Sequence, residues 1–83
     1  ENAMYKNKSE SGTNNICGPK IRQLRLKIKH ISQRELADML QIQGLDVDKN
    51  AIQRIESGQR FVTDIELRVL AKTLNVSYED LLD

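Results

Sequence analysis

The stretch that decides the fold of this chain is residues 32–58, SQRELADMLQIQGLDVDKNAIQRIESG. At its start, Ser32 and Glu35 have the spacing of a capping box, in which each side chain bonds a backbone N–H at the beginning of a helix. Apolar residues then recur at helical intervals as far as Gly44, a residue type that commonly ends a helix in a left-handed conformation. We therefore expect a helix over about residues 33–43.

The second half of the same stretch has the pattern of a shorter helix. Asp48 is a good N-cap residue, and Ile52 and Ile55 lie three positions apart on one face. Gly58 again marks a helix end. The pattern predicts a helix over about residues 49–57, with its polar side chains on the face opposite the two isoleucines.

Further helices are predicted on both sides of this stretch. Before it, Ile21, Leu24 and Ile28 form an apolar stripe, and Pro19 suits the first position of a helix over about residues 19–29. After it, capping-box patterns open two more helices, at residues 63–66 and 77–80. The first of these helices offers four apolar side chains for packing: Ile65, Val69, Leu70 and Leu74. No segment alternates as a strand does, so the expected fold class is all-α, a compact bundle of five helices.

Length and composition limit what this chain can do. Its 83 residues suffice for one small domain, and a composition of 39% apolar and 30% charged residues is typical of a folded chain. No apolar run is long enough to span a membrane and no secretory signal is present, so we expect a cytoplasmic protein. Cys17 and His30 are the only residues of their types, which leaves no conventional zinc site and no catalytic pair. We expect no enzyme activity, cofactor, metal or small-molecule ligand.

The first fifteen residues, ENAMYKNKSESGTNN, are polar and lack apolar periodicity. We expect a flexible arm over residues 1–15, in which Met4 is the native start and the residues before it are a remnant of expression. Lys6 and Lys8 leave open a second interpretation, an arm that binds nucleic acid. Residues 16–83 are expected to form the folded domain.

The charges nearly cancel, with 13 basic and 12 acidic residues, but they are unevenly distributed. Residues 20–34 contain six basic residues and no acidic one, whereas residues 62–83 contain five acidic residues and two basic ones. Such a layout can present a basic face to a polyanion. An ordinary solvated surface explains it equally well, so charge alone does not choose between the two.

The order of these motifs resembles one family of proteins. The pattern SQxELA at residues 32–37, followed by IxRIExG at residues 52–58, is similar to the Cro/C1-type (XRE) helix-turn-helix family of DNA-binding proteins, and the resemblance covers residues 18–83. It implies a lambda-repressor-like fold in which the helix over residues 49–57 is the recognition helix. One departure is the long connection at residues 41–47, where the family has a tight turn. We expect the preceding helix to gain a turn and the linker to lengthen.

The resemblance also implies roles for individual residues. In helix-turn-helix docking, the second helix of the motif enters the major groove, where Arg or Lys suits guanine and Asn or Gln suits adenine. The residues implied for base readout are Lys49, Asn50, Gln53 and Arg54. Contacts to DNA phosphates are implied for Gln33, Arg34, Gln59 and Arg60, although Arg34 has an alternative partner in Asp38, four residues on. Arg25 and Glu56 are implied to form a structural salt bridge.

These expectations lead to a function. We expect sequence-specific binding of double-stranded DNA by a homodimer at a palindromic operator, with a role in transcription regulation as a repressor. The alternative is an antitoxin or another interaction module whose main partner is a protein. That partner would contact the arm or the acidic, leucine-rich end at residues 79–83. No association with a membrane is expected.

Overall fold

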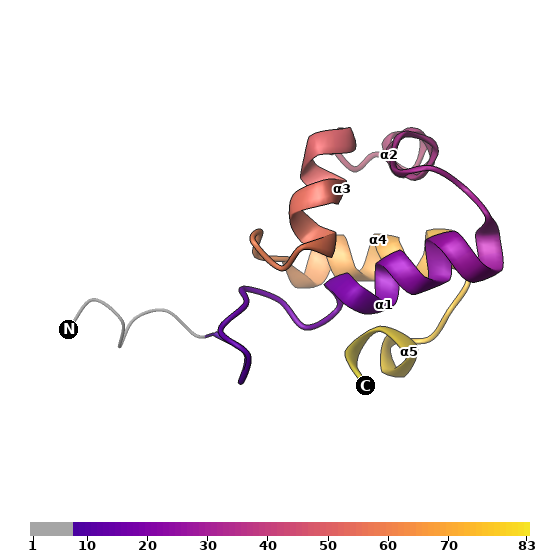
Figure 1. Cartoon of the computed structure of the whole chain (residues 1–83). Coiled ribbons are helices and arrows are strands. Elements are labelled where there is room, and N and C mark those ends of the chain that lie inside the picture. Colours follow the sequence, from indigo (N-terminus) through magenta and orange to yellow (C-terminus); the bar gives the residue numbers. More distant parts are fainter. Residues whose placement is uncertain (1–7) are drawn as a thin grey trace.

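The computed structural model describes residues 8–83, and every regular element in this range is a helix. In chain order the elements are α1 (Gly18–Gln23), η2 (Leu24–Lys29), α2 (Gln33–Ile42), α3 (Lys49–Glu56), α4 (Asp64–Leu74) and α5 (Tyr78–Leu82). α1 and η2 form one continuous rod. α4 packs against η2, whereas α3 and α5 pack against α1 (Figure 1). The expected all-α bundle of five helices is confirmed, because α1 and η2 together make up its first helix.

The core lies where these helices meet, and every α-helix contributes to it. Its largest fully buried aliphatic side chains are Ile21, Leu36, Leu40, Ile52, Ile55, Leu70, Leu74 and Leu81. Burying one such side chain stabilises the fold by about 1.5–3 kcal/mol, so this cluster supplies most of the stabilising free energy. Ile65, which was expected to pack, is instead 70% exposed, because it lies on the side of α4 opposite Leu74.

Both ends of α2 are set by hydrogen bonds between residues that are close in the sequence. Ser32 Oγ accepts a hydrogen bond from the Glu35 backbone N–H at 3.0 Å, and Glu35 Oε1 accepts one from the Ser32 N–H at 2.9 Å, which completes the expected capping box. At the other end Gly44 has a left-handed conformation, and the Leu45 N–H bonds the Leu40 carbonyl at 3.0 Å. This is a Schellman ending, and it stops the helix one residue before the expected position.

The long connection between α2 and α3 is held by a buried valine. Val47 is 3% exposed, and its carbonyl accepts a hydrogen bond from Gln41 Nε2 at 2.7 Å. Asp48 then caps α3, since its Oδ1 accepts from the Ala51 N–H at 2.8 Å. α3 ends at Glu56, one residue before the expected end. Packing and hydrogen bonds therefore place α3 in spite of the length of the linker.

The first helix differs from the regular α-helix that was expected. Its second half, η2, is π-helical: the His30 N–H bonds the carbonyl of Arg25, five residues back, and the Ile31 N–H shares that carbonyl at 3.1 Å. The wider π-helical turns rotate the side chains in the second half of η2 away from the apolar face on which Ile21 lies. As a result Ile28, which was expected in the apolar stripe, is 62% exposed.

The polar residues that precede α1 also differ from expectation. Residues 8–15 were expected to belong to a flexible arm, but the Asn14 N–H bonds the carbonyl of Gly58 at 2.8 Å and holds this segment against the domain. The physical reason is that a backbone carbonyl in a loop has no partner in regular secondary structure and accepts donors from elsewhere. The rest of the expected arm, residues 1–7 with Met4 and Lys6, lies outside the described residues.

Candidate nucleic-acid interface

The outward face of α3 carries the side chains that were expected to read DNA bases. α3 buries its two isoleucines and leaves exposed Lys49, Asn50, Gln53 and Arg54. Three of these residues line one shallow hollow with two that follow the helix: Asn50, Gln53, Arg54, Ser57 and Gln59. The only acidic residue of α3, Glu56, is buried. The structure therefore brings amide and cationic groups together on one exposed surface.

The start of α2 carries two further residues of the expected interface. The side-chain amide of Gln33 donates to Glu56 Oε1 at 3.1 Å, so Gln33 also ties the start of α2 to the end of α3. Arg34 is exposed, and within residues 8–83 it forms no ion pair with Asp38. The first backbone N–H groups of a helix lack partners within it and favour anions. The start of α2 therefore offers N–H groups and one cation to a phosphate.

The salt bridge expected between Arg25 and Glu56 is present and deeply buried. Arg25 Nε lies 2.7 Å from Glu56 Oε2, Nη2 lies 2.9 Å from Oε1, and the side chains are 7% and 4% exposed. The third donor, Nη1, bonds the Ile31 carbonyl at 3.1 Å. The hydrogen bond to Glu56 raises the pKa of Arg25, while burial acts in the opposite direction. The pair joins η2 to α3 and keeps both of its charges inside the protein.

The two loop residues expected to contact phosphates differ in their surroundings. Gln59 is exposed, whereas Arg60 is half-buried and forms an ion pair with Glu66 of α4. Arg60 Nη2 lies 2.8 Å from Glu66 Oε2, and Nη1 lies 3.0 Å from Oε1. The hydrogen bond from Arg60 lowers the pKa of Glu66, while burial acts in the opposite direction. Arg60 therefore braces the loop against α4.

A capped α2, a linker and an exposed α3 occur in this order in one known family. A family model described as helix-turn-helix matches residues 21–81, a span that includes both helices of the motif. The chain belongs to the Cro/C1-type (XRE) helix-turn-helix family. Membership makes it a DNA-binding helix-turn-helix regulator, and the family's domain is a binding module and not an enzyme. No curated protein and no solved structure gives a significant match to the chain.

Two residues at the interface of this helix-turn-helix protein were not expected from its sequence. Asn14 Nδ2 donates to the Gln59 carbonyl at 2.8 Å, and Asn15 Nδ2 donates to the carbonyls of Ile55 at 3.0 Å and of Arg60 at 2.7 Å. Both asparagines precede the matched span and stand in a polar stretch without periodicity. Only the tertiary fold brings them to the loop after α3.

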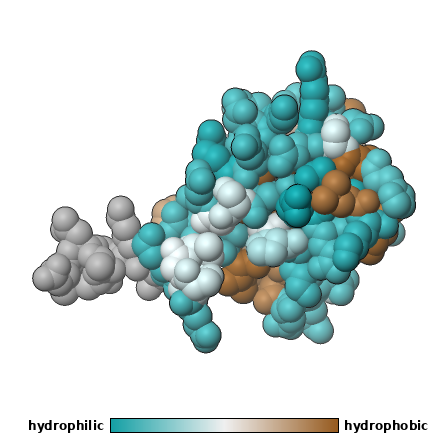
Figure 2. All heavy atoms as spheres, in the orientation of Figure 1, coloured by the Kyte–Doolittle hydropathy of each residue, from teal (hydrophilic) through white to brown (hydrophobic). Residues whose placement is uncertain are grey.

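The rest of this helix-turn-helix domain shows where the surface is polar and where it is not. Over α2 and α3 the visible surface is mainly hydrophilic, and hydrophobic side chains gather near the end of η2 and between α5 and the residues that precede α1 (Figure 2). In the acidic end at residues 79–83, Leu81 is buried and Leu82 is 40% exposed. On the face shown in Figure 2, the surface over the two helices of the motif is thus mainly polar.

Within residues 8–83 the helix-turn-helix protein has one cysteine and no cluster of metal-binding side chains. Cys17 is buried, and this burial raises the pKa of its thiol and disfavours the reactive thiolate. In this part of the chain no three residues among His, Cys, Asp and Glu are grouped so that they could hold a metal ion. None of the helices described there has the length and apolar character needed to cross a membrane.

Proposed function

We propose that this protein represses transcription by binding a specific operator in double-stranded DNA as a homodimer. The observation that supports base reading is the exposed face of α3, where Asn50, Gln53 and Arg54 surround one hollow. Arg pairs well with guanine, and Asn or Gln with adenine, at their edges in the major groove. A protein that occupies an operator excludes other proteins from the same DNA, which is the simplest physical route to repression.

Contacts to phosphates position α3 in this proposal. The start of α2 supplies backbone N–H groups and Arg34, and the loop after α3 supplies the exposed Gln59. Lys49 adds positive charge at the start of α3. Because the Arg60 guanidinium is engaged by Glu66, we assign Arg60 to support of the loop. Neutralising phosphates releases counterions, so the affinity for DNA should fall as the salt concentration rises.

A second copy of the chain fits the exposed apolar side of α4 and α5. Ile65 and Tyr78 are 70% and 50% exposed, and they line one hollow with Asp64 and Arg68. Within residues 8–83 neither Asp64 nor Arg68 forms an ion pair. In an antiparallel arrangement about a two-fold axis, each Asp64 would face the other copy's Arg68. The surface is then complementary to itself, which supports a dimer formed through α4 and α5.

Selection of bound sequences from a random DNA pool tests the proposed operator. The protein should enrich a palindromic sequence, and its affinity for that duplex should fall with salt. One altered base pair in a half-site should cost about 1–3 kcal/mol of binding free energy. A reporter gene placed behind the selected sequence should be expressed less when the protein is present. Binding that ignores both base sequence and salt defeats base reading, and increased reporter expression defeats repression.

The proposed dimer surface is tested by a charge placed at its centre. Ile65→Lys should weaken association, because a desolvated lysine opposes packing of the two apolar sides. Ile42→Lys is the matched control, since Ile42 is 82% exposed but lies on α2. Sedimentation of both variants over a range of concentrations measures the dissociation of the dimer. Equal association of Ile65→Lys and Ile42→Lys would exclude the α4 and α5 surface.

A further inference from the structure

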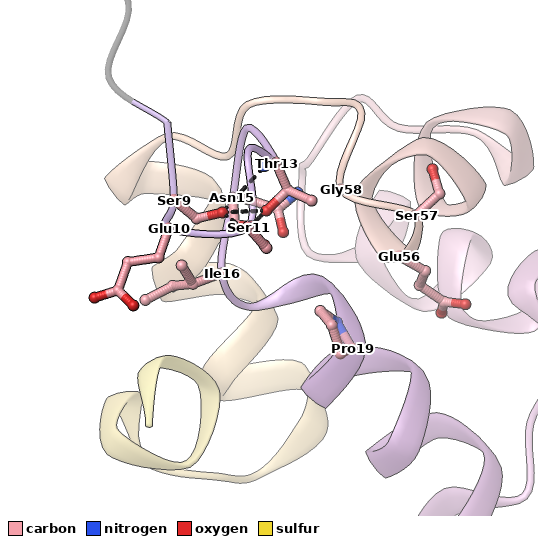
Figure 3. A pocket seen from close by; sticks show the side chains of 10 residues that line it. All are labelled: Ser9, Glu10, Ser11, Thr13, Asn15, Ile16, Pro19, Glu56, Ser57 and Gly58. Atoms are coloured by element: carbon pink, nitrogen blue, oxygen red, sulfur yellow. Dashed lines mark hydrogen bonds between the residues drawn. The ribbon is translucent and has the colours of Figure 1, made fainter.

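The loop that follows α3 (residues 57–60) is held by contacts from a part of the chain outside α2 and α3. This part is the N-terminal segment (residues 8–17), which lies against the end of α3, with Thr13 and Asn15 beside Gly58 (Figure 3). Asn14 bonds two carbonyls of the loop, that of Gly58 through its backbone N–H and that of Gln59 through its side chain, each at 2.8 Å. The conformation of the loop is therefore fixed by hydrogen bonds to its backbone carbonyls as well as by its side chains.

Asn15 extends these contacts to both ends of the loop. Its Nδ2 donates to the carbonyl of Ile55, in the last turn of α3, at 3.0 Å and to that of Arg60 at 2.7 Å. Its Oδ1 accepts from the Gly18 N–H at 2.9 Å. One side chain thus joins the start of α1, the end of α3 and the loop, and all of its hydrogen-bonding groups are used inside the protein.

Two glycines permit the close approach of these backbones. A Cβ atom at Gly18 would collide with the Ile55 carbonyl oxygen, and one at Gly58 would lie 2.6 Å from Thr13 Cγ2. Gly58 also has a φ of +82°, which strains any other residue. Backbones in such contact cannot shift without losing packing. The position of the loop is therefore set by the N-terminal segment as well as by α3.

We propose that Asn14 and Asn15 are positioning residues for DNA binding: they hold residues 57–60 so that Gln59 lies beside the reading face of α3. This inference rests on the proposed function. Gln59 is exposed and lines the same hollow as Arg54, while its carbonyl is bonded to Asn14. Holding the backbone of the loop leaves the Gln59 side chain available to a phosphate without the entropic cost of ordering the loop on binding.

The loop keeps other restraints when the asparagine side chains are removed. The N–H groups of Gln59 and Arg60 both bond the Arg54 carbonyl, at 2.9 and 3.2 Å, and the Arg60 guanidinium remains paired with Glu66. We therefore expect the helices to stay folded while the loop gains freedom. A merely structural role would lower stability and leave the affinity of the folded protein unchanged.

The test compares two asparagine variants with a matched control. Asn15→Ala removes the side-chain bonds to Ile55 in α3 and to Arg60 in the loop. Asn14→Ala removes the side-chain bond to Gln59 and keeps the backbone bond to Gly58. Val76→Ala trims a half-buried side chain between α4 and α5, away from the loop, and sedimentation checks that its association equals that of the wild-type protein. The probe is the duplex that the wild-type protein selects from a random pool, used at a temperature at which circular dichroism shows each variant folded.

We expect Kd for this duplex to rise about tenfold in Asn15→Ala and about threefold in Asn14→Ala, because hydrogen bonds of ordinary strength are lost. Amide hydrogen exchange of Gln59 and Arg60 should accelerate more than that of the core of α2. Val76→Ala should lower Tm and leave Kd unchanged.

Each outcome of this test has a distinct meaning. Unchanged Kd in both asparagine variants, or a rise no larger than that of Val76→Ala, overturns the inference and leaves the proposed function standing. If Asn15→Ala does not fold, the milder Asn14→Ala decides by the same measurements. If the wild-type protein selects no DNA at all, the proposed function fails, and this inference fails with it.

Discussion

Two arginine–glutamate pairs with nearly the same geometry stand at different depths in this molecule. Arg25 and Glu56 approach to 2.7 Å with side chains 7% and 4% exposed, whereas Arg60 and Glu66 approach to 2.8 Å with side chains 27% and 15% exposed. In the first pair each charge depends on the other, because water cannot replace a lost partner. Water reaches the second pair and weakens it. An arginine–glutamate pair is therefore essential to stability at Arg25 and Glu56, whereas the pair of Arg60 and Glu66 adds only a small contribution.

A third arginine extends the comparison. Arg54 is exposed on α3 and forms no ion pair within the part of the chain that the structure describes. Arg25 pairs with the last residue of α3, and Arg60 follows α3 in the loop, so all three arginines are close to α3. Burial and available partners, and not residue type, separate Arg25 and Arg60, which hold the domain, from Arg54, which we propose contacts DNA.

Removing the buried acid should give the largest effect. Glu56→Ala leaves the Arg25 guanidinium buried without its carboxylate and should lower the free energy of unfolding by about 3–5 kcal/mol. Urea denaturation measures the change. Glu79→Ala is the control, because Glu79 is an exposed acid on α5 and should change stability by less than about 0.5 kcal/mol. Equal stability of the two variants would show that the Arg25–Glu56 pair contributes no more than a surface charge.

Removing the unpaired arginine should affect binding and not stability. Arg54→Ala should lose about 1–3 kcal/mol of discrimination at one base pair of the selected duplex, while its Tm stays close to that of the wild-type protein. Fluorescence titrations with duplexes altered at single positions measure the loss. Lys72→Ala removes an exposed cation of α4 and should weaken binding to all duplexes slightly and equally. A uniform loss in Arg54→Ala as well would assign Arg54 to phosphate contact.

Neutralising the partly exposed acid should give the smallest effect. Glu66→Gln keeps the shape of the side chain and the capping box with Thr63 but removes the charge that faces Arg60, at a cost of up to about 1 kcal/mol near neutral pH. Thermal unfolding of both proteins over a range of pH measures the difference.

The sign of the pH dependence follows from the lowered pKa of Glu66. The charged form stabilises the fold fully above the pKa of the unfolded chain, about 4.3, and this stabilisation is lost as the pH falls through the lower pKa of the folded state. The difference between wild type and Glu66→Gln should therefore shrink below about pH 4. A difference that stays constant down to pH 2 would contradict an ionic contribution from this pair.

Sequence patterns predicted the helices well and the partners of polar side chains within the protein less well. The capping box at Ser32 and the cap at Asp48 are present as predicted, because a cap bonds atoms only three residues away. The contact of Arg60 with phosphate stays a prediction, but the pairing of its guanidinium with Glu66 was not foreseen. Ile28 and Ile65 were predicted to pack and are exposed, because the π-helical turns rotate the first and the second lies on the outer side of α4.

The sequence alone determined the helical elements, their capped ends and the family, because periodicity and caps act within one or two turns of the chain. Tertiary structure alone decided which polar groups remain for a ligand. Asn15 bonds a carbonyl 45 residues away, and Gln33 bonds a carboxylate 23 residues away, so neither pairing can be deduced from neighbours in the chain. A polar side chain is available to DNA only if the fold brings it no closer partner, and distant segments supply those partners.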